Sequence, residues 1–187
     1  MTVIAYDTEF LEGNRTIDLI SIGLVRDDGT EYYAVNSAAN WAEIGKHRWL
    51  CENVVPHLPL AGKGISEVQE NGRGTAKTWK FAVDTTDTHV KPHWVIANEV
   101  REFILAVDDP ALWADWGAYD HVVLCWLWGT MMQLPAGIPM WTHDLRQEIE
   151  RAGNPVIPPL GGLAAHHALG DAREVMWRLN WLREHAA

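Results

Sequence analysis

A nearly continuous run of apolar and β-branched residues, from Thr16 to Arg26, is the feature of the sequence that most constrains its fold. A run of this composition and length predicts a buried strand at the centre of a sheet. Residues 2–6 predict a strand before it, and residues 30–35 predict another after the turn signal Asp28-Gly29. Three strands joined by short links indicate a sheet that begins with antiparallel pairs.

The rest of the chain alternates helical patterns with one further strand. Residues 111–115 predict the fourth strand. Helices are expected at residues 40–50, 98–107, 119–128, 144–152 and 163–184. The sequence therefore predicts an α/β fold, with a mixed sheet of about five strands flanked by helices.

A chain of 187 residues is long enough for one domain with a substantial core and short for two. We therefore expect a single domain over residues 1–187, with a long loop or insertion around residues 51–96. That segment is rich in Gly, Pro and Thr, although Trp79, Phe81 and Val83 alternate as in a short strand. Its basic residues leave two interpretations open: a flap that contacts phosphate groups, and a solvated loop.

Composition narrows the classes of function. The formal net charge is −10, from 25 Asp and Glu against 15 Lys and Arg, which counts against a protein that coats nucleic acid with a basic face. Carboxylates loaded with divalent cations can hold phosphate, so the charge is compatible with a nuclease. The 11 Trp residues are expected mainly in the core, with base stacking as a minority role.

Cysteine usage and hydropathy indicate the compartment. Cys51 and Cys125 lie far apart and are expected to be reduced packing residues. The sequence shows neither a secretory signal nor an apolar run of membrane-spanning length. Paired Cys or His ligands at the usual spacing are also absent, which disfavours a structural zinc protein. We expect a cytoplasmic protein that does not contact a membrane.

Two carboxylates follow the first predicted strand directly, in the sequence Asp7-Thr8-Glu9. Residues i and i+2 of an extended segment point to the same side, so these two side chains should lie close together. Like charges at that separation repel each other unless a cation lies between them, and Mg²⁺ favours such oxygen ligands. Taken alone, the motif is better explained if Asp7 caps a turn and Glu9 is solvated.

A further acidic candidate, Asp120, lies where the strand at residues 111–115 passes into a helix. An acidic residue there is also favoured by the helix dipole without any catalytic role. Asp115 is a nearby competitor, but it lies inside or at the end of the strand.

The final candidates are His166 and Asp171, which lie five residues apart. In a regular helix such residues are roughly 140° apart around the axis. We therefore expect His166 on the approach to the last helix and Asp171 on its first turns. A histidine there is a suitable general base for a metal-bound water. A helix-capping histidine and a surface aspartate are the alternatives, and His167 is a rival for the role of base.

Taken in order, Asp7-Thr8-Glu9, Asp120 and His166 with Asp171 resemble the motifs of the DEDDh 3′–5′ exonuclease superfamily, which includes ribonuclease T and oligoribonuclease. The family spacing selects His166 over His167. The segments YDTEF, TIDLISIG, EYYAV, GAYDHVVLCWLWG, LRQ and HxALxDAR are similar to the actinobacterial polyadenylate-specific 3′-exoribonuclease AS family. This similarity covers residues 1–35 and 111–178.

The resemblance implies a ribonuclease H-like fold and two-metal hydrolysis of phosphodiester bonds. It implies that Asp7, Glu9, Asp120 and Asp171 hold two Mg²⁺ or Mn²⁺ ions about 3.5–4 Å apart. His166 would take the proton from the attacking water, and nucleoside 5′-monophosphates would leave from the 3′ end. The substrate contacts that it suggests are Thr8, Phe10 and Leu11, of which Phe10 and Leu11 are equally well explained as packing residues.

The partner that the resemblance implies is the 3′ end of single-stranded RNA, with poly(A) as one candidate. It also suggests a homodimer. A DNA or short-oligonucleotide 3′–5′ exonuclease with the same site is the first alternative. The second is a catalytically inactive nucleic-acid-binding or scaffold protein, although such a protein has no need of all five motif residues.

Overall fold

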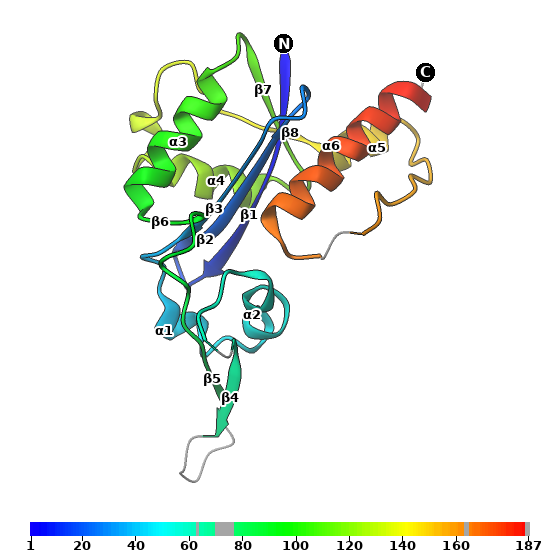
Figure 1. Ribbon diagram of the computed structural model, residues 1–187. Coiled ribbons are helices and arrows are strands. Elements are labelled where there is room, and N and C mark those ends of the chain that lie inside the picture. Colours follow the sequence, from blue (N-terminus) through cyan, green and yellow to red (C-terminus); the bar gives the residue numbers. More distant parts are fainter. Residues whose placement is uncertain (63, 70–76, 163–164, 186–187) are drawn as a thin grey trace.

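A mixed six-stranded sheet forms the centre of the computed structural model, which describes residues 1–62, 64–69, 77–162 and 165–185. The strand order is β6-β3-β2-β1-β7-β8 (Figure 1). The strands are β1 Thr2–Glu12, β2 Ile17–Arg26, β3 Glu31–Asn36, β6 Val90–Lys91, β7 Pro110–Ala114 and β8 His143–Asp144. β1, β2 and β3 pair antiparallel, whereas β6, β7 and β8 each join by parallel pairing. The predicted α/β class and antiparallel start are confirmed.

Helices cover both faces of this sheet. α3 (His93–Leu105) and α4 (Ala118–Trp126) lie on one face, and α5 (Leu145–Arg151) and α6 (Ala168–His185) lie on the other (Figure 1). The side chains of β1 alternate accordingly: Ile4 and Tyr6 pack with α3 and α4, whereas Val3 and Ala5 pack with α5 and α6. Full burial of a large apolar side chain contributes about 1.5–3 kcal/mol, so these two layers hold β1 in place.

A third apolar cluster lies toward the carboxyl end of β1, where the chain between β3 and β6 folds over the sheet. This part consists of α1 Trp41–Ile44, α2 Arg48–Asn53, the 3₁₀ turn η1 Val55–His57, and a hairpin of β4 Ser66–Gln69 and β5 Lys77–Lys80. A second 3₁₀ turn, η2 Met131–Gln133, follows α4.

The prediction of a single helix at residues 40–50 is wrong, because the chain forms two short helices there. The Gly45 carbonyl accepts a hydrogen bond from the Trp79 N–H at 2.8 Å, which ties the end of α1 to β5. The ring of His47 then begins α2 by accepting from the Leu50 N–H at 3.4 Å. A long-range contact with the hairpin therefore interrupts the local helical pattern.

The last helix begins at Ala168 rather than at residue 163, of which the structure describes nothing. His166 has a φ of 64°, a left-handed conformation that a helix cannot continue through. The His167 ring accepts from the Gly170 N–H at 3.3 Å and so satisfies one of the free donors at the start of α6. The expectation that His166 precedes the helix and Asp171 lies on its first turn is confirmed.

Within the described ranges, the structure has no helix that is both long and apolar enough to span a membrane.

Candidate active site

The edge of β1 that β7 leaves unpaired receives Asp120. β7 pairs with β1 only from Thr2 to Ala5, so the backbone of β1 beyond Ala5 has a free edge on that side. α4 begins shortly after β7 ends and carries Asp120 in its first turn. The backbone N–H and the hydroxyl of Thr8 both donate to Asp120 Oδ1, at 2.9 Å and 2.6 Å. This pair of hydrogen bonds holds the carboxylate of Asp120 against β1, beside Asp7.

The rival aspartate, Asp115, is engaged elsewhere. Its carboxylate forms an ion pair with Arg146 of α5 at 2.6 Å. A carboxylate held by a guanidinium is less available as a ligand for a second cation. The geometry therefore favours Asp120 as the acidic residue of this region that serves the site.

Gly23 of β2 allows α6 to reach the same place from the other side. Gly23 is the direct partner of Asp7 in the β1–β2 register. A Cβ atom at Gly23 would lie 2.4 Å from the backbone N and Cα of Leu169, so the first turn of α6 rests directly on the sheet. Absence of a side chain at this position is what brings Asp171 next to Asp7 and Glu9.

Glu9, His166 and Asp171 form the closest cluster. Each offers one ligand atom, and these atoms all lie within 4.8 Å of one another. Glu9 is only 7% exposed, and the backbone N–H of His166 donates to Asp171 Oδ2 at 2.9 Å. This hydrogen bond holds His166 in its left-handed conformation, a strained geometry of the kind found at functional sites.

The four carboxylates of the site influence one another strongly. Burial raises the pKa of Asp7 well above its ordinary value, and the charges of Asp120, Glu9 and Asp171 raise it further. Burial, with the charges of Asp171 and Asp120, raises the pKa of Glu9 to about 8. Burial also raises the pKa of Asp120 to about 6, although the two bonds from Thr8 oppose this, and it raises the pKa of Asp171.

Such a set of buried carboxylates is unfavourable in the ionised form unless a cation joins it. The atoms available as metal ligands are carboxylate oxygens, with one histidine nitrogen at their border. Mg²⁺ and Mn²⁺ prefer ligands of this kind. The residues therefore fit a hard divalent metal.

The other residues named from the sequence have clear structural positions. His167 stacks on Tyr33 with ring centroids 4.5 Å apart and caps α6, which disfavours it as the base. Phe10 is half-buried and meets Tyr119 edge-on at 5.9 Å. Leu11 is buried in the third apolar cluster, and Thr8 is buried with its hydroxyl on Asp120. The proposed contacts of Thr8, Phe10 and Leu11 with substrate stay predictions.

One neighbour of the site had no signal in the sequence. Trp49 of α2 meets the ring of His166 edge-on, with centroids 4.7 Å apart and the planes at 74°. The side chain is 47% exposed, although its pattern indicated the apolar face of a helix. By contrast, Gly23 carried a detectable signal, because a glycine inside a β-branched strand indicates close backbone approach.

Comparison with known proteins agrees with this geometry. Residues 2–182 match the model of a family described as the 3′-5′ exoribonuclease Rv2179c-like domain. Two relatives from Mycobacterium tuberculosis, named 3′-5′ exoribonuclease Rv2179c (strain H37Rv) and 3′-5′ exoribonuclease MT2234.1 (strain CDC 1551), are each 38% identical over 175 residues. Each alignment covers 92% of this chain and 88% of the relative. The predicted resemblance to a 3′–5′ exonuclease is confirmed, and the chain belongs to the Rv2179c-like 3′–5′ exoribonuclease family.

Proposed function

We propose that this chain is a divalent-metal-dependent exoribonuclease that removes nucleoside 5′-monophosphates from the 3′ end of single-stranded RNA. The observation that carries the proposal is the convergence of Glu9, His166 and Asp171 within 4.8 Å, beside Asp7 and Asp120. We further propose that residues 1–187 form one such domain and that it acts in the cytoplasm. Poly(A) is the first substrate to test, and a homodimer is the expected assembly.

The carboxylates have the first role in this mechanism. Asp7, Glu9, Asp120 and Asp171 would hold Mg²⁺ or Mn²⁺, and Thr8 would keep Asp120 oriented through its two hydrogen bonds. When bound, these ions would lower the pKa of a water molecule and neutralise charge on the scissile phosphate. The protein itself supplies carboxylate oxygen atoms that are already in position and largely shielded from water.

His166 has the second role. Its ring lies at the border of the carboxylate cluster, where it would accept the proton of the attacking water. The water oxygen would bond to phosphorus as the bond from phosphorus to the 3′ oxygen of the preceding nucleotide breaks. That 3′ oxygen would leave as a hydroxyl, and the terminal nucleotide would leave as a 5′-monophosphate. Trp49, whose ring packs edge-to-face with that of His166, would limit the rotation of the His166 ring.

Hydrolysis of matched RNA, DNA and poly(A) strands with Mg²⁺ or Mn²⁺ tests the proposal. Asp7→Asn should lower turnover by more than about a hundredfold, because it removes a charged ligand, and EDTA should abolish it. Asp108→Asn changes an exposed aspartate in the same way and should leave turnover unchanged. Equal activity of the two variants would overturn the metal assignment, and faster hydrolysis of DNA than of RNA would overturn the substrate.

His166→Ala should largely abolish turnover while the protein stays folded and still binds metal. Circular dichroism and metal titration are the controls. Near-normal turnover of this variant would remove His166 as the base.

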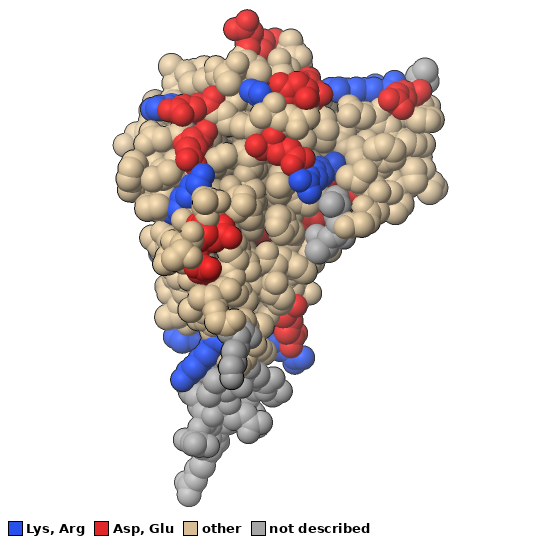
Figure 2. All heavy atoms as spheres, viewed as in Figure 1, with Lys and Arg blue, Asp and Glu red and all other residues tan. Residues whose placement is uncertain are grey.

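On the face of the molecule in Figure 2, basic and acidic side chains are interspersed. Basic side chains also lie near the base of the β4–β5 hairpin. This distribution agrees with the net charge of −10 and does not indicate a protein that relies on a broad basic surface to hold RNA. Base and sugar contacts close to the site should then carry much of the substrate binding.

A further inference from the structure

A hollow of about 480 Å³ lies beside the carboxylate cluster. Its volume is within the range of about 300–1,000 Å³ typical of small-molecule sites. The residues most relevant to its chemistry are Tyr33, His57, Asp87, His89, His167 and Arg173, and Asp87 is paired with His89 at 2.9 Å. Aromatic and imidazole rings therefore make up much of its wall.

The sheet fixes the distance of this hollow from the carboxylates. Asp7 pairs with Gly23, and Gly23 pairs with Tyr33, so these residues form one row across three strands. Two strand spacings separate the backbones of Asp7 and Tyr33 by about 10 Å, so the hollow lies to one side of the carboxylates. The hollow and the site are still neighbours, because Leu169 lines the hollow and rests on Gly23, the direct partner of Asp7.

The side chains of the hollow suit a base and a ribose better than a phosphate group. The ring of Tyr33 packs against two histidine rings: His167 is stacked on it with centroids 4.5 Å apart, and His89 is tilted against it with centroids 5.6 Å apart. The guanidinium of Arg173 is already held by both carboxylate oxygens of Glu31, so it is not a free anion clamp. Rings that stack on bases, with ring nitrogens near a 2′-hydroxyl, are the means by which proteins hold single-stranded RNA.

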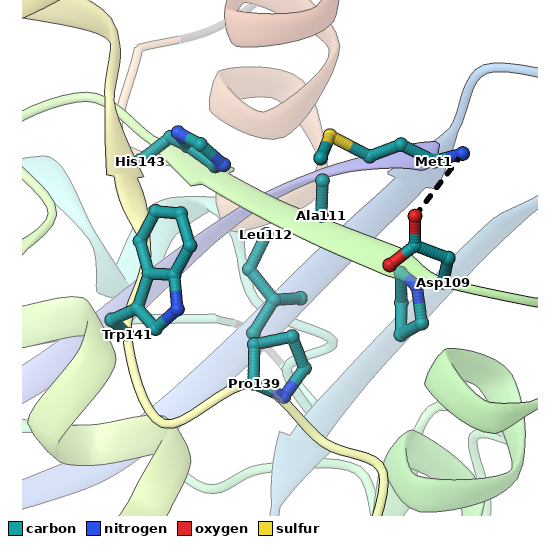
Figure 3. A pocket seen from close by; sticks show the side chains of 8 residues that line it. Met1, Asp109, Ala111, Leu112, Pro139, Trp141 and His143 are labelled. Carbon is teal, nitrogen blue, oxygen red and sulfur yellow. Dashed lines mark ion pairs between the residues drawn. The ribbon is translucent and has the colours of Figure 1, made fainter.

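A second hollow, shown in Figure 3, serves as a comparison. It measures about 160 Å³ and is lined by Met1, Asp109, Leu112, Pro139, Trp141 and His143 among others. It lies at the amino-terminal ends of β1 and β7, and an ion pair of 3.4 Å between the Met1 amino group and Asp109 closes one side. Its size and its separation from the carboxylates disfavour it as a nucleotide site.

The position of the larger hollow indicates which nucleotide it would hold. Phe10 packs with the apolar cluster of α3 and α4, whereas the hollow is formed by β3, the start of α6 and the chain between β3 and β6. The carboxylates neighbour both places, since Glu9 directly precedes Phe10, and Leu169 of the hollow rests on Gly23 opposite Asp7. If the terminal nucleotide contacts Phe10, the strand on the 5′ side of the scissile bond passes toward the hollow.

We propose that this hollow binds the base and ribose of the RNA nucleotide that precedes the terminal one. The inference rests on the proposed exoribonuclease function and adds a binding site upstream of the scissile bond. It also assigns a role to residues 51–96, because His57, Leu58 and His89 all come from that segment. These three residues would then form the outer wall of the path that the substrate follows.

Two substrates separate this site from the catalytic centre. The p-nitrophenyl ester of adenosine 5′-monophosphate has only the terminal nucleotide, whereas 5′-phosphorylated diadenylate also has the preceding one. The variant combines His57→Ala and His89→Ala; His57 is half-buried and His89 is exposed, so the fold should persist. His185→Ala, at the exposed end of α6, is the matched control.

The double variant should raise the KM for diadenylate roughly tenfold, as expected when a base loses a stacking partner. Its kcat/KM for the p-nitrophenyl ester should equal that of wild type, and His185→Ala should change neither substrate. His89→Phe, which keeps a ring, should retain most of the affinity for diadenylate. Equal losses on both substrates, or an unchanged KM for diadenylate, would overturn the proposal.

A binding measurement distinguishes failure of this site from failure of the proposed function. Asp7→Asn protein, titrated with fluorescently labelled oligoadenylate, should bind roughly tenfold more weakly after the two histidine substitutions. A wild-type protein that hydrolyses neither substrate would refute the exoribonuclease proposal. Loss of binding in the double variant would then still support the hollow as a nucleotide site, and unchanged binding would refute it.

Discussion

Substitution of Gly23 by alanine should separate the carboxylates that we propose to be catalytic, without altering any of them. A Cβ atom at this position would lie 2.4 Å from the N and Cα of Leu169 and 2.5 Å from the carbonyl carbon of Ala168. All three are backbone atoms, so no side chain can rotate away. Ordinary Cβ contacts begin at 3.4 Å, and the start of α6 must therefore retreat by about 1 Å.

This displacement would reach the site directly. Asp171 lies two residues beyond Leu169 in the same first turn of α6, and its carboxylate holds the backbone N–H of His166. A misplacement of about 1 Å can lower a catalysed rate by about a hundredfold. The added methyl group should also cost about 1–3 kcal/mol of folding free energy, as overpacking does, which lowers Tm by several degrees in a chain of this size.

Steady-state hydrolysis of single-stranded RNA, with circular dichroism melting of the same samples, measures both effects. We expect kcat for Gly23→Ala to fall by about a hundredfold while the protein remains folded at the assay temperature. Gly13→Ala is the matched control, because its Cβ would meet chiefly the side-chain oxygen of exposed Thr16, which can rotate away. Turnover of Gly23→Ala within twofold of wild type would refute the proposed role of this contact.

Three further predictions concern the neighbours of the site. Thr8→Val removes the 2.6 Å hydrogen bond from the Thr8 hydroxyl to Asp120. A hydrogen bond to a charged group contributes about 1.5–3 kcal/mol, so metal affinity and kcat should each fall about tenfold or more. A metal titration that matches wild type would contradict this. Trp49→Ala should lower kcat several-fold at constant KM, because the His166 ring becomes freer to rotate. Trp49→Phe, which keeps an aromatic ring, should restore most of the kcat. A Phe variant as impaired as the Ala variant would argue that Trp49 does not position His166. The pKa of Glu9 rises from 4.5 to about 8 on folding, so its contribution to stability is complete below pH 4.5 and is lost as pH rises through about 8. Metal-free protein should therefore show a falling Tm across that window and Mg²⁺ or Mn²⁺ should reverse the fall, whereas a Tm independent of pH would refute the pKa shift.

The parts of the fold that local patterns determine were predictable. The central strand and its two neighbours follow from β-branched runs separated by a turn signal, and the structure has them as β1, β2 and β3. The position of His166 before α6 also followed from a local rule, since residues five apart cannot share a helical face. The carboxylate set was named from the sequence because its order resembles a known family, and its roles remain predictions.

What the sequence could not supply depends on contacts between distant residues. The break between α1 and α2 arises from the bond between Gly45 and Trp79, which are far apart in the chain. The short strand β8 depends on pairing with β7 and has no pattern of its own. The sequence favoured Asp120 and left Asp115 as a competitor, and only the structure shows that Arg146 binds Asp115. Residues 51–96 gave little local signal, since their apolar side chains join a cluster assembled from several segments.

The bond between Asp120 and the backbone of Thr8 has a consequence for solubility as well as for the site. Beyond Ala5, β1 offers backbone donors that β7 does not satisfy, and an unpaired strand border can recruit another chain once its cover is lost. The Asp120 carboxylate occupies one of these donors and places a negative charge at the border. Loss of this side chain should therefore make the protein more prone to self-association, and light scattering during concentration would reveal it separately from any loss of activity.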